Sequence, residues 1–423
     1  MPGTFFSDQK IEQLIAMYGL LNDLTVVEGA SFIAGPSCAL HLAQMGAKVI
    51  RFDMIGGGPD FYRWPLNGRG DSLYWEGLNK GKLSVALDLR RPEGREIAVA
   101  LVTAPGEGRG MFVTNFPVDG FLSHAALSAR RPDLITLRVQ GWPDGRNGVD
   151  YSVNATVGIP FMTGPENLPA DVPVNTALPA WDLLAGAYGA FSLLAAERRR
   201  RVNGQGAELR LALSDLAIGS LAHLGQVAEA SLGADRGRHG NAIFGAFGRD
   251  FVTSDGKPLM IVAITPRQWA GLLAALEITD AVAMLETALG TSFATDEGER
   301  FRHREPLGKL IAAAVAGRTA DALIPQLEVA GVCWEPYRTL RQAVENDARL
   351  VRDNPIFTEI AHPGGNSYAT PGAMGRLVGE VAGPAQRAPR LGEHTAEVLE
   401  TVLGLGGAAL GRLFDEGLVA GPR

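Results

Sequence analysis

The chain has 423 residues, a length beyond which one hydrophobic core usually stops growing, so two domains or one domain with a large insertion are expected. Apolar residues make up 46% and charged residues 20% of the sequence, a composition that is typical of globular proteins and excludes a disordered chain. The formal net charge of -7 disfavours a general nucleic-acid surface but leaves room for a local basic pocket that binds an anion.

The N-terminal stretch MPGTFFSDQKIEQLIAMYG lacks a basic region and a cleavage site, so it predicts a short helix rather than a signal peptide. The longest apolar run, residues 183–196, contains two glycines and a serine and is shorter than the roughly 20 residues of a membrane span. Cys38 and Cys333 lie far apart and in no metal-binding spacing, which predicts free thiols in a reducing compartment. We therefore expect a cytoplasmic protein that binds neither membrane nor nucleic acid.

The first 150 residues alternate between strand-like and helical sequence. Residues 24–53 read as a strand, a Gly/Pro turn, a helix and a second strand, and further β-rich runs lie at 82–89, 110–116 and 134–141. This alternation predicts an α/β fold with a Rossmann-like, open parallel sheet. No GxGxxG follows the first strand, so the pattern gives little support to a nicotinamide dinucleotide site.

The remaining sequence predicts a second, smaller domain. Residues 178–201 form one long helix, and residues 247–278 combine a strand, an Asp-Gly hairpin, a second strand and a helix, which is typical of a small α+β domain. We expect this domain at 226–344. The C-terminal helix, beginning at His394 or Thr395, is expected to return to the first domain, which then comprises 1–225 and 345–423.

Asp182, near the start of the predicted helix 178–201, allows two interpretations. A carboxylate at this position stabilises the helix as an N-cap or first-turn acid, and this is the commoner role for an aspartate at a helix start. The same position also suits a nucleophile, because an ionised carboxylate can attack an acyl carbon while nearby backbone N–H groups receive the oxyanion. Gly186 and Gly189 leave room beside it for a substrate, or equally for a closely packed helix.

Other local patterns are less specific. The three glycines before Arg63 lack the Lys-Ser/Thr of a phosphate-binding P-loop and are more typical of a turn. Lys80 and Lys82 are suited either to a solvated surface or to an anionic cofactor. The seven histidines show no HExxH or HxH spacing, so no metal site is expected, and no GxSxG elbow of a serine hydrolase is present.

Several segments in fixed order together resemble the family III CoA transferases, the group that includes formyl-CoA transferases, carnitine CoA transferases and α-methylacyl-CoA racemases. These segments are VVEGASFIAGPSCALHLAQMGAKVIRFD, LNKGKLSVALDLRRPEGRE, FVTNFP, RPDLITLRVQG, the Asp182 helix with NGQGAELRLALSDLA, and APRLGEHTAEVL. The resemblance spans almost the whole chain. It implies an interlocked homodimer whose large domain is built from both chain ends.

The resemblance also assigns roles to individual residues. Asp182 falls on the family's nucleophile, which favours the catalytic interpretation over the local one. Residues that align with the family's CoA-binding positions are Phe32, Ile33, Arg63, Lys82, Leu87 and Asn115. The family's glycine-rich lid corresponds to 240–248, with Gly240, Asn241, Gly245 and Gly248, but the run of four glycines seen in formyl-CoA transferases is missing.

Finer features, among them GGGPDFYRWP, DYSVNATVGIPFMTGP and GNAIFGAFGRDF, are most similar to members that move CoA between the two carboxylates of mesaconate. The expected reaction is therefore intramolecular transfer from C1 to C4 through aspartyl anhydride and aspartyl-CoA thioester intermediates, with an acyl-CoA substrate and no cofactor or metal. Intermolecular transfer to a separate acid is the alternative. Racemisation is disfavoured because Val149 stands where a racemase has its histidine base, and a CoA-binding protein whose Asp182 only caps its helix is a third hypothesis.

Overall fold

The computed structural model describes residues 18–422, so most of the short helix predicted for residues 1–19 lies outside the described residues. The chain divides into two compact units. The first comprises the residues up to Val157, Ala177–Glu229 and the residues from Ala348 onward, and the second comprises Gly158–Thr176 and Ala230–Asp347.

The first unit is built on a seven-stranded sheet in the order β12-β3-β2-β1-β4-β5-β6. Neighbouring strands from β3 to β6 are parallel, which confirms the predicted open parallel α/β sheet. The two-residue β12 adds an antiparallel edge that no sequence pattern predicted. The strands are β1 Thr25–Gly29, β2 Lys48–Met54, β3 Leu83–Leu87, β4 Met111–Thr114, β5 Ile135–Gln140, β6 Ala207–Ala212 and β12 Val419–Ala420.

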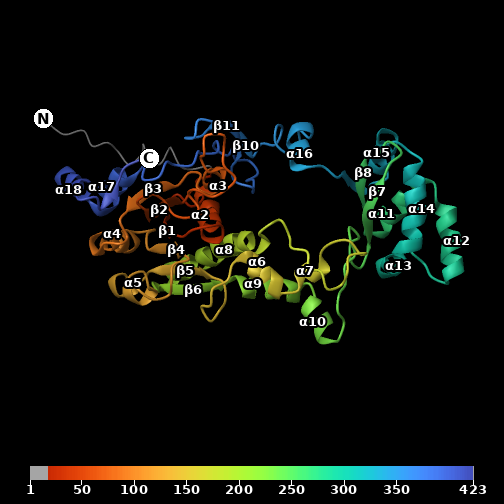
Figure 1. Cartoon of the computed structure of the whole chain (residues 1–423), viewed down its shortest axis with the longest axis horizontal. Helices are drawn as coiled ribbons and strands as arrows, with labels where there is room; N and C mark the ends of the chain where they lie inside the picture. Colours follow the sequence, from red (N-terminus) through yellow and green to blue (C-terminus); the bar gives the residue numbers. More distant parts are fainter. Residues whose placement is uncertain (1–17, 423) are drawn as a thin grey trace. The chain divides into compact units, whose positions relative to one another are not determined.

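Helices cover both faces of this sheet (Figure 1). On one face, α2 (Ala34–Gln44) and α8 (Ala180–Asn203) pack on β1, β2, β4 and β5 around a core that includes Leu42 and Leu193. The absence of side chains at Gly186 and Gly189 allows this close packing. A Cβ on Gly186 would come within 2.0 Å of Ser37 Oγ in α2, and one on Gly189 within 2.9 Å of Leu137. Both glycines therefore serve helix packing rather than space for a substrate.

The opposite face is covered by helices from both ends of the chain. The helices α4 (Pro92–Thr103), α5 (His124–Arg130), α17 (Thr395–Leu403) and α18 (Gly407–Asp415) share one apolar core with the sheet. Figure 1 shows α17 and α18, drawn in blue, beside β3. The predicted start of the C-terminal helix is confirmed, and His394 N donates to Ser84 O at 2.9 Å, which attaches the C-terminal segment to β3.

Four further helices and a small antiparallel sheet complete the first unit. They are α3 Leu73–Leu78, α6 Asp150–Thr156, α9 Leu213–His223, the helix α10 Gln226–Ser231 that reaches into the second unit, and the paired strands β10 Phe357–Ala361 and β11 Ser367–Pro371. Among residues 18–422, no helix is long and apolar enough to cross a bilayer.

The second unit combines a three-stranded antiparallel sheet with helices around a separate apolar core. The predicted Asp-Gly hairpin is confirmed, since β7 pairs antiparallel with β8 and Gly256 has a φ of 73°. Its elements are α7 Ile159–Met162, β7 Phe247–Val252, β8 Pro258–Ala263, α11 Pro266–Leu276, α12 Thr279–Leu289, α13 Glu297–Arg302, α14 Arg304–Ala316, α15 Ala320–Val329, β9 Cys333–Pro336 and α16 Leu340–Asn346.

Residues 158–176 correct the predicted domain boundary. The sequence pattern assigned them to the large domain, but they belong to the second unit. The physical reason is Arg238, whose guanidinium donates to the carbonyl oxygens of Pro160, Thr163, Pro169 and Val172 and so ties the segment to the second unit.

Candidate active site

Asp182 lies in the first turn of α8, but it does not cap the helix. The N-cap position, Pro179, offers no side-chain acceptor. Instead, Oδ2 of Asp150 accepts hydrogen bonds from the backbone N–H groups of Trp181 at 2.7 Å and Asp182 at 3.0 Å. A carboxylate 32 residues earlier in the chain therefore performs the capping that local sequence had favoured for Asp182.

The carboxylate of Asp182 is left available for chemistry. The carboxylate makes no hydrogen bond with any side chain or backbone group that the structure describes. Asp182 is bonded only through its backbone N–H, which donates to Asp150. Burial first, and the charge of Asp150 second, raise the pKa of Asp182 from 3.8 to about 6, while Arg63 opposes the shift. The group is thus ionised at neutral pH yet poorly solvated, which is the state required of a carboxylate nucleophile.

The N-terminal turns of α8 and α2 lie side by side. Asp182 precedes Gly186 by four residues and so shares its helix face, and Gly186 contacts Ser37 of α2. Trp181 packs with Ala34 in one cluster. Ile33, the N-cap of α2, provides no side-chain cap, and Pro36 has no N–H, so the first-turn N–H groups at this end of α2 are those of Ala34 and Gly35.

Phe32, predicted from the resemblance, is held at this edge of the sheet in an unusual conformation. Its φ of 70° is left-handed, and its side chain remains 40% exposed. Asn115, after β4, fixes the loop: its Oδ1 accepts from Ser31 N at 3.1 Å and its Nδ2 donates to Ser31 O at 2.9 Å. β1 and β4 are the strands between which the sheet order reverses, where open α/β sheets bind their ligands.

Arg63 completes this group of predicted residues. Its guanidinium carbon lies 5.5 Å from the ring centre of Phe32 and 5.4 Å from that of Tyr74 in α3. The structure therefore brings together Asp182, Arg63, Phe32, Ile33 and Asn115 around the start of α2.

Lys82 and Leu87 lie inside the protein, and both predictions of direct CoA contact require correction. Leu87 ends a central strand and is fully buried in the sheet core. Lys82 is buried as well, with Nζ 2.7 Å from Glu28 Oε2 and hydrogen-bonded to Pro36 O at 2.9 Å and to Asn79 Oδ1. Because its ammonium group is fully engaged, Lys82 supports the start of α2 rather than a ligand.

Lys82 belongs to a buried ion cluster that positions the Arg63 loop. Arg51 on β2 pairs with Glu28 at 2.9 Å and with Asp53 and Asp60 at 2.8 Å each. Asp60 lies in the loop 55–63, so this ion pair ties the loop to the sheet three residues before Arg63.

The predicted lid residues belong to the second unit, whereas Asp182 belongs to the first. Gly240 and Gly245 have positive φ angles of 57° and 80°, and Asn241 is exposed between them. Gly248 is the second residue of β7, and its carbonyl oxygen accepts a hydrogen bond from Ile243 N at 2.9 Å.

The same segment carries an aromatic anchor that a glycine lid lacks. Phe244 contacts the ring of Phe301 at 4.9 Å and lies 3.6 Å from the guanidinium carbon of Arg236.

Two residues of the site were not identified from the sequence, namely Asp150 as the cap and Tyr74 beside Arg63. No local signal reveals a cap supplied from 32 residues away, although Asp150 stands in one of the segments similar to the family. The Tyr74 hydroxyl is buried and has no hydrogen-bond partner among the described residues. Burial raises the pKa of Tyr74, and so does Asp182, while Arg63 lowers it.

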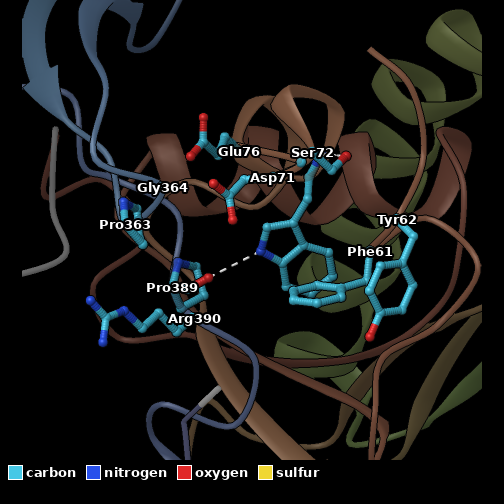
Figure 2. A pocket seen from close by; sticks show the side chains of 11 residues that line it. Phe61, Tyr62, Asp71, Ser72, Glu76, Pro363, Gly364, Pro389 and Arg390 are labelled. Carbon is cyan, nitrogen blue, oxygen red and sulfur yellow. Dashed lines mark hydrogen bonds between the residues drawn. The ribbon is translucent and has the colours of Figure 1, made fainter. Parts of the chain in front are cut away.

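A separate pocket of about 300 Å³ lies between α3 and the C-terminal segment (Figure 2). Trp75 forms part of its wall and donates from Nε1 to Pro389 O at 3.0 Å. Asp71 and Glu76 line it together with a single cation, Arg390, so its charge opposes the phosphates of CoA. None of the residues predicted to bind CoA lines this pocket.

Within the part of the chain that the structure describes, no three His, Cys, Asp or Glu side chains are arranged to hold a metal ion. Cys38 and Cys333 are both free thiols, the first buried and the second exposed.

Comparison with known proteins defines the class first. The model of CoA-transferase family III matches residues 21–395, and the chain belongs to this family of CoA-transferring enzymes. The structure resembles the crystal structure of a CAIB/BAIF family protein from Brucella suis, with a TM-score of 0.72 and 25% identity over 90% of this chain and 99% of the other.

Individual relatives are more specific. The chain is 48% identical to the 2-methylfumaryl-CoA isomerase of Chloroflexus aurantiacus over 96% of this chain and 99% of that enzyme. It is 28% identical to the succinyl-CoA:mesaconate CoA-transferase of Haloarcula hispanica over 90% of this chain and 96% of the relative.

Proposed function

We propose that this protein moves CoA between the C1 and C4 carboxylates of mesaconate, converting 2-methylfumaryl-CoA into 3-methylfumaryl-CoA. The observation that carries the proposal is the carboxylate of Asp182, which is relieved of helix capping by Asp150 and poorly solvated at the edge of the sheet. The 48% identity to a 2-methylfumaryl-CoA isomerase over nearly the whole chain supports the choice of substrate.

The first half of the reaction transfers CoA to the enzyme. An oxygen of the Asp182 carboxylate attacks the C1 thioester carbonyl, the C–S bond breaks, and CoA thiolate leaves behind a mixed anhydride of Asp182 and mesaconate. The thiolate then attacks the aspartyl carbonyl and displaces mesaconate as a free carboxylate. The enzyme now holds an aspartyl-CoA thioester.

The second half returns CoA to the other end of the same acid. The C4 carboxylate attacks the aspartyl thioester and expels the thiolate, and the thiolate attacks the C4 carbonyl of the new anhydride to regenerate Asp182. No water, cofactor or metal enters this balance, and the proposal therefore requires none. First-turn N–H groups of α2, which no side chain caps, are suited to stabilise the oxyanions of these steps.

Mesaconate must stay bound between the two halves, since its escape would convert the isomerase into an intermolecular transferase. We assign this retention to the segment 240–248. In place of a run of glycines it carries Phe244, anchored on Phe301, which stiffens the segment.

We also propose a homodimer, with the cytoplasm as the location. The solvent face of α8 presents Leu183, Tyr188 and Phe191, which are 38%, 47% and 64% exposed, and the last two rings contact each other at 5.8 Å. An apolar face of this kind, on the helix that carries the nucleophile, favours coverage by a second copy. Replacing Phe191 with Asp is expected to lower the mass measured by light scattering from that of a dimer to that of a monomer.

The decisive assay supplies the C1 thioester of mesaconate without any added acid and resolves the C4 isomer by chromatography. A parallel reaction contains isotopically labelled free mesaconate. Unlabelled C4 thioester supports internal transfer, whereas labelled product supports intermolecular transfer, the alternative favoured by the similarity to a succinyl-CoA:mesaconate CoA-transferase.

Hydroxylamine added during turnover should convert Asp182 to a hydroxamate that mass spectrometry locates. Absence of modification at this residue while the wild-type enzyme turns over would refute its role as nucleophile.

A further inference from the structure

Two hydrogen-bond donors beside Asp182 have no partner within residues 18–422. The hydroxyl of Tyr74 is buried without a hydrogen bond. The guanidinium of Arg63 forms no ion pair with the described residues, and its contacts are with the rings of Phe32 and Tyr74. Tyr74 is thus a buried donor without an acceptor, which destabilises the protein unless a ligand supplies that acceptor, whereas Arg63 is exposed and offers its positive charge to a ligand.

These two donors are placed by the same short stretch of chain. Ser72 Oγ donates to Arg63 O at 2.6 Å and accepts from Trp75 N at 3.1 Å, so the cap of α3 joins the backbone of Arg63 to the helix that carries Tyr74. The backbone of Arg63 is therefore held relative to α3 in the absence of a ligand, which reduces the entropy lost on binding.

The charge around the nucleophile explains why a cation is needed there if an anionic acyl group is to bind. Asp150 and Asp182 place two carboxylates at the start of α8, and the charge of Asp150 raises the pKa of Asp182. A dicarboxylic acyl group brings a further negative charge close to its own thioester, where the two carboxylates repel it. Arg63 is the cation that lowers the pKa of Asp182, and it forms no ion pair with the residues that the structure describes.

We propose that Arg63 and Tyr74 together bind the free carboxylate of the dicarboxylic acyl group and so determine which carboxyl group faces Asp182. This inference rests on the proposed function. The two donors hold the C4 carboxylate while Asp182 attacks C1, and they hold the C1 carboxylate when CoA returns to C4. The same pair then selects dicarboxylic over monocarboxylic thioesters, because a methyl group in place of the carboxylate leaves both donors without an acceptor.

Binding to the inactive Asp182→Asn enzyme tests the proposal without turnover. The two probes are the C1-CoA thioester of mesaconate and tiglyl-CoA, in which a methyl group replaces the C4 carboxylate, and both are titrated calorimetrically. We expect Arg63→Gln to weaken mesaconyl-CoA binding by about 10- to 100-fold and tiglyl-CoA binding by less than about threefold. Tyr74→Phe should weaken mesaconyl-CoA by about three- to tenfold and leave tiglyl-CoA unchanged.

Arg95→Gln is the matched control, since Arg95 also lies over an aromatic ring, with its guanidinium carbon 5.5 Å from the ring centre of Phe121. It is expected to change neither affinity. Tyr74→Phe removes only an unpartnered hydroxyl, so it should fold normally and separates a binding role from a structural one.

Equal loss for both thioesters in Arg63→Gln would overturn the proposal and assign Arg63 to the CoA moiety. Unchanged binding of both thioesters in both variants would overturn it as well. The proposed function fails separately, if the wild-type enzyme does not convert the C1 thioester to the C4 isomer.

Discussion

Asp182→Asn is expected to stabilise the folded protein while it abolishes activity, and this combination separates a nucleophile from a helix-capping acid. Burial and Asp150 raise the pKa of Asp182 from 3.8 to about 6. Each tenfold change in a protonation constant is worth about 1.4 kcal/mol, so ionised Asp182 destabilises the fold by up to roughly 3 kcal/mol at neutral pH. Because the residue is only half-buried, solvent screening reduces the expected gain to about 1 to 3 kcal/mol.

The gain depends on pH in a defined direction. Above pH 6 the carboxylate is ionised in both the folded and the unfolded state, so the variant shows its full advantage. As the pH falls from 6 toward 4 the folded state takes up the proton first, and the advantage disappears. Thermal unfolding measured between pH 4 and pH 8 should show a Tm that is about 2 to 6 °C higher for the variant at pH 8 and equal to wild type at pH 4.

Asp215→Asn provides the matched control. Asp215 occupies the third position of α9, the same position that Asp182 occupies in α8, but Asp215 is exposed. Loss of its favourable interaction with the helix dipole should lower stability by about 0.3 to 1 kcal/mol. A Tm that falls in Asp182→Asn as it does in this control would show that Asp182 serves its helix, and the reasoning would be refuted.

Three further changes test the surroundings of the site. Asp150→Asn retains an acceptor for the two N–H groups of α8 but removes a charge, so the acidic limb of the pH-rate profile should move to lower pH by up to about one unit. Asp150→Ala should in addition lose about 1 kcal/mol of stability, measured by thermal unfolding. An unmoved acidic limb would contradict the electrostatic coupling between Asp150 and Asp182. Lys82→Met leaves Glu28 buried without its ammonium partner, so the free energy of unfolding measured in urea should fall by about 3 to 5 kcal/mol. A raised KM for the acyl-CoA with unchanged stability would instead indicate that Lys82 contacts the ligand directly. Replacing residues 242–245 with four glycines removes the aromatic anchor and should increase the free mesaconate released per turnover, measured by chromatography; unchanged release would refute retention by this segment.

The strands, the order of α/β elements and the C-terminal return were predictable from sequence because each rests on local patterns of hydrophobicity, turns and caps. The hairpin at Gly256 and the start of α17 followed from the same signals. The two-residue edge strand β12 and the assignment of residues 158–176 were not predictable, since they depend on contacts with distant parts of the chain.

For the site, local sequence placed a carboxylate at the start of a long helix, and resemblance to a family favoured that carboxylate as the nucleophile. That Asp182 is relieved of capping could be seen only in the folded chain, because the acceptor comes from Asp150 on another helix. Likewise, Lys82 carries the motif of a ligand contact, yet its charge is matched by Glu28 inside the protein. The physical reason is the same in both cases: ionic and hydrogen-bonding partners are chosen by proximity in space, and sequence spacing fixes such proximity only within a helix, strand or turn.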